Sequence, residues 1–175
     1  MINSTEILAA ARLPLLALGI QANALREEAF GNRTFFAATP ADALDLAVPV
    51  SASPEEIVAA LLAARERQPV SVAPQVTASG NQTTGEAEIR LIALARLAFP
   101  PHVHIRANWT ALTDAIAQVA LRFGADELDG FPAGLDRREI WRAIREAGRE
   151  PFPCDALYAP VELTEPVAKL RILPS

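Results

Sequence analysis

Three polar side chains that can bind a ligand alternate along one short segment of the sequence. In the run 102–109, HVHIRANW, the residues His104, Arg106 and Asn108 stand at every second position, with apolar residues between them. Successive side chains of a β-strand point to opposite faces of its sheet, so these three are predicted to share one face. An imidazole, a guanidinium and a carboxamide on one face can hold an anionic or carboxylated ligand.

The same histidine also offers a catalytic interpretation. His104 can act as a general base if Asp129 or Asp126 orients its ring. The sequence holds only two histidines, however, and shows neither a nucleophile motif nor carboxylates at a catalytic spacing. We therefore predict no catalytic residue, and keep His104 with Asp129 as the alternative. His102 and His104 would need a distant carboxylate to complete a metal site, so no metal site is predicted.

The segments around this run alternate between helical and extended patterns. Apolar residues recur at helical spacing in 86–99 and in 112–123. Helices alternating with short strands are typical of βα units and a parallel sheet. We predict an α/β fold, either an incomplete (β/α) barrel or an open parallel sheet, preceded by a helical lead-in. The predicted strands are 33–37, 44–50, 70–77, 102–109 and 126–129; the predicted helices are 4–12, 14–30, 54–67, 85–99, 112–123 and 136–147.

The chain length fits a single domain, 1–175, with a sizeable core. Within it we expect a helical lead-in at 1–32, a partial barrel at 33–163 and a tail at 164–175. The tail itself is ambiguous between a short helix and a final strand.

Further polar residues fall near the carboxyl ends of the predicted strands or on matching faces. Parallel barrels place ligand sites at those strand ends. The alternative is a buried polar network, or a strand edge that faces water or another subunit. Asp45 is one such residue, and the predicted ligand-binding set is Ser51, Gln75, Thr77, His104, Arg106, Asn108 and Asp129.

Composition excludes several classes of protein. A hydrophobic content of 51% with 21% charged residues is globular, and a net charge of −5 without a basic cluster argues against nucleic-acid binding. No apolar run reaches membrane-spanning length and no charged leader precedes one, so a soluble cytoplasmic protein is expected. The one cysteine, Cys154, permits no internal disulfide and no cysteine-based zinc or iron–sulfur site. No cofactor is predicted.

Several stretches resemble one family of enzymes. ALARLAFPPHVHIRANW (93–109) and AQVALRFGADELDG (117–130) resemble the C-terminal half of the radical SAM enzymes of the menaquinone pathway. Aminofutalosine synthase, the dehypoxanthine futalosine cyclase and the FO synthase subunits belong to this group. LLALGIQANALREEAFGNRTFF (15–36) resembles their helical lead-in, and IREAGREPFPCDALY (144–158) resembles their closing segment.

The resemblance also shows what is missing. In that family a cysteine triplet, C-x3-C-x2-C, follows the first strand and holds an iron–sulfur cluster, whereas here the chain leads directly into the strand 44–50. Both ends of a longer enzyme are thus represented without its middle. At 131–134 the sequence FPAG departs from the threonine and acidic residues usual in the family, which affects the inherited substrate site.

The resemblance implies a non-catalytic or auxiliary relative of aminofutalosine synthase. Such a protein would bind a futalosine- or chorismate-derived ligand, or pair with a full-length synthase. Its expected partners are a small anionic metabolite and either a second copy of the chain or a radical SAM paralogue. The alternatives are a small independent acid–base enzyme acting on an anionic metabolite, and a purely structural or regulatory interaction protein.

Overall fold

The computed structural model describes residues 2–37, 42–77 and 85–162. It begins with two helices, α1 (Ser4–Ala11) and α2 (Leu15–Phe30). Asn3 and Glu6 form a reciprocal capping box at the start of α1, as the sequence pattern favours. Gly31 ends α2 with a φ of 63°, a conformation that glycine adopts at little cost. The predicted helical lead-in is therefore present.

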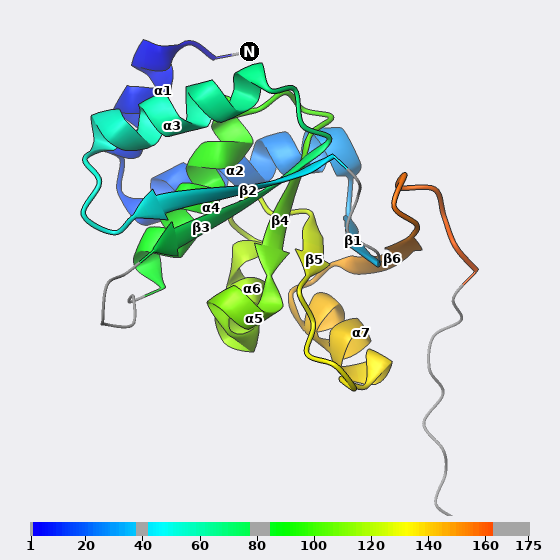
Figure 1. Cartoon of the computed structure of the whole chain (residues 1–175). Coiled ribbons are helices and arrows are strands. Elements are labelled where there is room, and N and C mark those ends of the chain that lie inside the picture. Colours follow the sequence, from blue (N-terminus) through cyan, green and yellow to red (C-terminus); the bar gives the residue numbers. More distant parts are fainter. Residues whose placement is uncertain (1, 38–41, 78–84, 163–175) are drawn as a thin grey trace, which may run out of the picture.

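Six parallel strands form one open sheet in the order β2-β3-β4-β5-β1-β6 (Figure 1). The strands are β1 (Arg33–Ala37), β2 (Ala43–Pro49), β3 (Ser71–Thr77), β4 (His104–Asn108), β5 (Glu127–Asp129) and β6 (Glu150–Cys154). The helices that follow the lead-in are α3 (Pro54–Glu66), α4 (Glu86–Ala98), α5 (Trp109–Leu112), α6 (Asp114–Ala120) and α7 (Arg137–Glu146). This arrangement confirms the predicted α/β class with an open parallel sheet, which does not close into a barrel.

The apolar side chains of the strands lie under the helices. Leu44, Ile105 and Leu128 belong to the main hydrophobic core, and Phe36 packs edge-on against Trp141 of α7. Helix α4 is buried over nearly its whole length because it lies between the sheet and the helices α1 and α2. The opposite face of the sheet, which carries His104, Arg106 and Asn108, is called the inner face below.

Pro74 explains where two neighbouring strands separate. β3 and β4 are paired only at Ser71 with His104 and at Val72 with Ile105. Because alternate residues of a parallel strand bond to the same neighbour, and His104 N donates to Val70 O, the backbone of Pro74 faces β4. Proline has no N–H to continue that ladder. The two strands therefore diverge toward their carboxyl ends (Figure 1).

Two local predictions were wrong. The expected helix 112–123 is divided into α5 and α6 by Thr113, whose φ is 73°, and Trp109 begins α5 rather than ending a strand. Strand β6 was not predicted, since the prolines in EPFPC are typical of loops. The predicted tail lies outside the described residues, and the single-domain assignment stays a prediction. In the described ranges no helix combines the length and apolarity needed to cross a bilayer.

Candidate functional site

The alternation expected of β4 is confirmed. Ile105 and Ala107 are buried in the core, whereas His104 and Arg106 lie on the inner face. The register of β5 places Glu127 beside Arg106 and Asp129 beside Asn108. Polar groups on this face form two adjacent layers, a lower one around His104 and an upper one around Arg106.

In the lower layer, His104 is enclosed on both sides of its ring. Tyr158 stacks on the imidazole with ring centres 3.6 Å apart and an interplanar angle of 10°. Phe30, at the end of α2, stacks at 4.6 Å. His104 Nδ1 lies 2.5 Å from Asp126 Oδ2, and the residue is only 7% exposed. Of the two predicted orienting carboxylates, the structure thus places Asp126 and not Asp129 against the histidine.

Asp126 is the acceptor that holds this layer together. Besides His104 it accepts hydrogen bonds from the Arg96 guanidinium and, at 2.8 Å, from Ile105 N. Arg96 also donates to Gly124 O at 2.9 Å, and burial lowers the pKa of its guanidinium. A Cβ on Gly124 would lie 2.8 Å from Arg96 Cβ, so glycine leaves the space that the arginine occupies. Asp126 and Arg96 therefore form a buried ion pair. Removal of either side chain would leave the other charge buried without a counter-charge.

Glu127 and Tyr158 complete the lower layer. Tyr158 OH donates to Glu127 Oε2 at 2.6 Å. Burial raises the pKa of Glu127 to about 8, and burial together with Glu127 also raises the pKa of Tyr158. Sequence reasoning missed both residues. The signal for Glu127 was its position two residues before Asp129 on the same strand, whereas the distant Tyr158 left no local signal.

The upper layer is a cluster of one guanidinium and two carboxylates. Arg106 Nη1 donates to Asp129 Oδ2 at 2.6 Å, and Arg106 Nη2 donates to Asp45 Oδ1 at 3.0 Å. Ala73 of β3 is the register partner of Asp45, and its small side chain leaves room for Arg106 to reach across β3. Burial raises the pKa of Asp129, and the charge of Arg106 opposes that rise. We refer to Asp45, Arg106 and Asp129 as the upper cluster.

The members of the upper cluster differ in exposure. The side chain of Asp45 is 75% exposed, whereas those of Arg106 and Asp129 are 3% and 5% exposed. Arg106 Nε and Asp129 Oδ1 are buried without a hydrogen-bond partner in the part of the chain that the structure describes. The buried pair of Arg106 and Asp129 thus holds the cluster together, while one further atom of each residue has unused hydrogen-bonding capacity.

The other predicted ligand residues lie apart from this cluster. Asn108 caps α5, where its Oδ1 accepts from Ala111 N at 2.9 Å. Gln75 and Thr77 share the inner face of β3, where Gln75 is half-buried and Thr77 is exposed. Ser51 lies in the turn after β2. The structure therefore joins Arg106 with Asp129, holds His104 in a separate layer, and leaves Ser51 away from both. Whether any of the predicted set binds a ligand stays a prediction.

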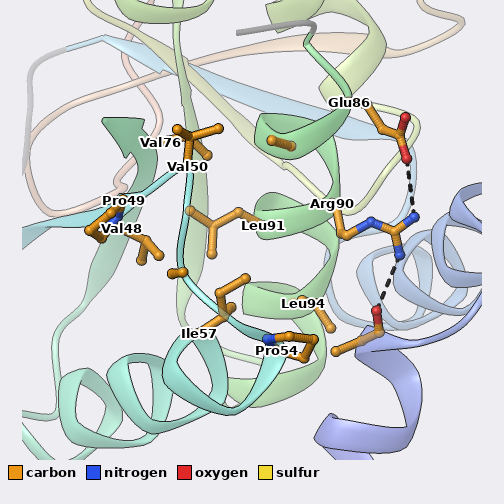
Figure 2. A pocket seen from close by; sticks show the side chains of 13 residues that line it. Val48, Pro49, Val50, Pro54, Ile57, Val76, Glu86, Arg90, Leu91 and Leu94 are labelled. Atoms are coloured by element: carbon orange, nitrogen blue, oxygen red, sulfur yellow. Dashed lines mark hydrogen bonds and ion pairs between the residues drawn. The ribbon is translucent and has the colours of Figure 1, made fainter. Parts of the chain in front are cut away.

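A separate cavity of about 430 Å³ lies on the helix side of the sheet, between α3, α4 and the ends of β2 and β3 (Figure 2). Its walls are apolar apart from Glu86 and Arg90. Arg90 donates to Glu86 at 3.3 Å and to Leu13 O at 2.8 Å, so its charge is used to join helices. Ser51 lines a smaller neighbouring cavity of about 240 Å³. Neither cavity contains a residue of the upper cluster.

The chain does not provide a cysteine cluster. Its one cysteine, Cys154, is buried, and burial raises the pKa of the thiol to about 12. Within 2–37, 42–77 and 85–162, no group of three His, Cys, Asp or Glu side chains could hold a metal ion. Three cysteine ligands cannot come from these 175 residues alone.

Residues 66–167 match the family described as the CofH/MqnC C-terminal region, which is more than half of the chain. The chain belongs to this family. The match runs from the end of α3 through β3, β4, β5 and β6, and includes Arg106 and Asp129; Asp45 lies before it.

Individual relatives agree with this assignment. The aminodeoxyfutalosine synthase of Thermus thermophilus is 37% identical over 99 residues, which cover 49% of this chain and 27% of that enzyme. The 5-amino-6-(D-ribitylamino)uracil–L-tyrosine 4-hydroxyphenyl transferase 2 of Methanosarcina barkeri is 34% identical over 119 residues, covering 59% of this chain and 30% of the relative. The corresponding transferase of Methanopyrus kandleri is 35% identical over 95 residues, covering 46% and 26%.

These similarities confirm the resemblance drawn from the sequence to the aminofutalosine synthase and FO synthase group of radical SAM enzymes. The chain spans 26–30% of the length of these three relatives. Their similarity therefore concerns one part of each enzyme.

Proposed function

We propose that this chain is an auxiliary, substrate-side portion of a synthase of the CofH/MqnC type. It holds part of a small metabolite on its inner face and does not itself generate a radical. The observation that carries this proposal is the upper cluster, in which the buried Arg106 is held by the buried Asp129 and by the exposed Asp45.

The two sides of Arg106 are held with different strength. Its pair with Asp129 is buried. Breaking such a pair leaves a buried charge without a counter-charge, which costs about 3–5 kcal/mol of stability. Its pair with Asp45 involves an exposed carboxylate, and exposed pairs contribute about 0–1 kcal/mol. A ligand oxygen can therefore replace Asp45 at Arg106 Nη2 at little cost, while Asp129 keeps the guanidinium in place.

The charges of the cluster favour a ligand rich in hydroxyl groups. Two carboxylates surround one guanidinium, so the site has acceptors for hydroxyl or amino donors and one donor for an oxygen. A ligand hydroxyl can donate to Asp45 and accept from Arg106 at once. Among the relatives, the names include an aminodeoxyfutalosine and a ribitylaminouracil. We therefore favour a futalosine-type metabolite bound through its sugar hydroxyls over a simple anion or a chorismate-derived carboxylate.

Radical chemistry would need cysteine ligands from outside these 175 residues. The single buried cysteine with a raised pKa does not suit cluster binding. Pairing with a full-length synthase, or with the cysteine-bearing part of one, is the arrangement that fits the length relation to the relatives. The alternative of a small acid–base enzyme has less support, because His104 is stacked on both faces and bound to Asp126.

Isothermal titration calorimetry with three probes tests the proposal: aminodeoxyfutalosine, 5-amino-6-(D-ribitylamino)uracil and chorismate. We expect one of the two sugar- or ribityl-bearing compounds to bind, and Asp45→Asn to weaken it about tenfold, as expected for loss of one hydrogen bond to a charged group. Asp42→Asn, three residues earlier and exposed, is the matched control and should leave the affinity unchanged.

The proposal fails if neither compound binds at concentrations up to about 1 mM, the weak end of metabolite affinities. Binding that is equally affected by Asp42→Asn and Asp45→Asn would also contradict it. Tight binding of chorismate alone would instead favour the anionic ligand that the sequence predicted.

A further inference from the structure

The two edges of the sheet differ in the backbone groups that they present. At the β6 edge, Glu150 N donates to Asn32 O at 2.8 Å, so Glu150 faces β1. Alternate residues of a parallel strand face the same neighbour, which turns Pro151 and Pro153 outward. Proline has no N–H, and Pro153 O already accepts from Val161 N at 3.1 Å. The β6 edge is therefore closed to further pairing.

The β2 edge has the opposite character. Val50 N donates to Thr77 O at 2.9 Å, so the even-numbered residues of β2 face β3. The N–H groups of Asp45 and Ala47 then point away from the sheet, and within the described ranges neither has a backbone acceptor. Both residues are exposed. Figure 1 shows β2 and β6 at the two ends of the sheet, with α3 running alongside β2.

We infer that the β2 edge is an interaction surface that takes one further parallel strand from another polypeptide, with a basic side chain placed beside Asp45. An exposed row of N–H and C=O groups is a template for strand addition. All strand pairs of the sheet are parallel, which continues the pattern at its edge. Because inner-face residues of paired strands lie side by side, the added strand brings a side chain next to the exposed carboxylate of Asp45.

A second copy of this chain does not fit the edge as well. A twofold contact through β2 would run antiparallel and bring two acidic edges together, each with Asp42 and Asp45, in a chain of net charge −5. Like charges in neighbouring strands destabilise pairing. The relatives, in contrast, extend well beyond the 26–30% of their length that this chain spans. A strand from that remaining length is the occupant to which we commit.

Overlapping synthetic peptides that tile the Thermus thermophilus aminodeoxyfutalosine synthase provide the probe, because a strand peptide needs no folded domain of its own. Binding of each labelled peptide to the intact chain is measured by fluorescence anisotropy. We expect at least one peptide with a lysine or arginine to bind, and its charge reversal to glutamate to weaken it about tenfold. Hydrogen exchange should slow at the outward N–H groups of Asp45 and Ala47 when the peptide binds.

Two proline positions supply matched variants. Ala47→Pro removes an outward N–H without removing a bond to β3, and should weaken peptide binding about tenfold or more. Pro151→Ala restores an outward N–H on β6 and should leave it unchanged. Far-ultraviolet circular dichroism and the melting temperature establish that Ala47→Pro folds; if it does not, Ala47→N-methylalanine, made by chemical ligation, removes the same N–H.

The inference is overturned if no peptide binds up to about 1 mM, if Ala47→Pro binds as the parent does, or if Asp45 and Ala47 gain no protection from hydrogen exchange in the complex. A stable dimer that Ala47→Pro dissociates would overturn it in favour of a second copy. Strand addition depends on the backbone N–H groups of Asp45 and Ala47, which Ala47→Pro tests by peptide binding. Ligand binding depends on the Asp45 side chain, which Asp45→Asn tests by calorimetry, so the failure of one proposal leaves the other measurable.

Discussion

His104 and Arg106 stand two residues apart on the same strand and the same face, yet their surroundings differ. His104 is stacked between Phe30 and Tyr158 and bound to Asp126, all within the protein. Arg106 is anchored on one side by Asp129 and meets the exposed Asp45 on the other. The ring of His104 is enclosed by internal contacts, whereas the upper cluster keeps hydrogen-bonding capacity next to an exposed carboxylate.

The difference comes from the chain segments that cover each layer. The lower layer is filled by the end of α2 and by the turn after β6, which bring Phe30 and Tyr158 onto the histidine from opposite ends of the sequence. Above it, the small Ala73 leaves room for Arg106 to span β3. Two polar residues with the same pattern thus serve stability in one case and, we propose, ligand binding in the other.

Replacing Asp126 should have the largest effect on stability. Asp126→Ala removes the common acceptor of Arg96, His104 and Ile105 N. The buried Arg96 loses its counter-charge, so we expect a loss of about 3–5 kcal/mol in the free energy of unfolding. Urea unfolding followed by circular dichroism measures it. A loss below about 1 kcal/mol would mean that the lower layer is not the structural one.

Glu127 should make stability depend on pH. Its pKa of about 8 in the folded protein lies above the value of 4.5 expected without burial. Between these values the folded state keeps a proton that the unfolded state has released, so stability falls as pH rises, by up to about 1.4 kcal/mol per pH unit. Unfolding titrations from pH 5 to pH 8 measure this slope.

Glu127→Gln tests whether Glu127 causes this pH dependence of the free energy of unfolding. The amide is permanently neutral, so the fall in stability contributed by position 127 should disappear. An unchanged slope in Glu127→Gln would show that another group is responsible.

Removing one hydroxyl from the lower layer should have a moderate effect. Tyr158→Phe keeps the stack on His104 but deletes the donor to Glu127 Oε2. A buried acceptor left without its partner costs about 1–3 kcal/mol. Thermal and urea unfolding give the value. Leu157→Ala, at a neighbouring side chain that is 85% exposed, should stay within about 0.5 kcal/mol of the parent.

The alternation of polar and apolar residues made the sheet and two of the three members of the upper cluster predictable. Because the side-chain period of a strand is two, Arg106 and Asp129 could be assigned to the inner face from sequence alone. Parallel βα units follow from the alternation of patterns, and five of the six strands were expected within a few residues.

The remaining contacts depend on information that is not local. Strand β6 pairs through Glu150, Phe152 and Cys154, so its prolines face outward, and a proline pattern does not reveal which side is paired. Tyr158 reaches His104 only because β6 lies beside β1. Asp45 could be placed near strand ends, but its contact with Arg106 required the register of β2 with β3 and the small size of Ala73.

Asp45→Asn should have the smallest effect on stability and the clearest effect on binding. Its carboxylate is three-quarters exposed, so loss of its charge should change the free energy of unfolding by at most about 1 kcal/mol. The same substitution should weaken the hydroxyl-bearing probe about tenfold, because the ligand loses a charged acceptor. Asp126→Asn should show the reverse order, with a large loss of stability and an affinity that stays near the parent value wherever the protein is folded. If Asp45→Asn instead destabilises the chain as strongly as Asp126→Asn, the upper cluster is as structural as the lower one, because both carboxylates then hold the fold.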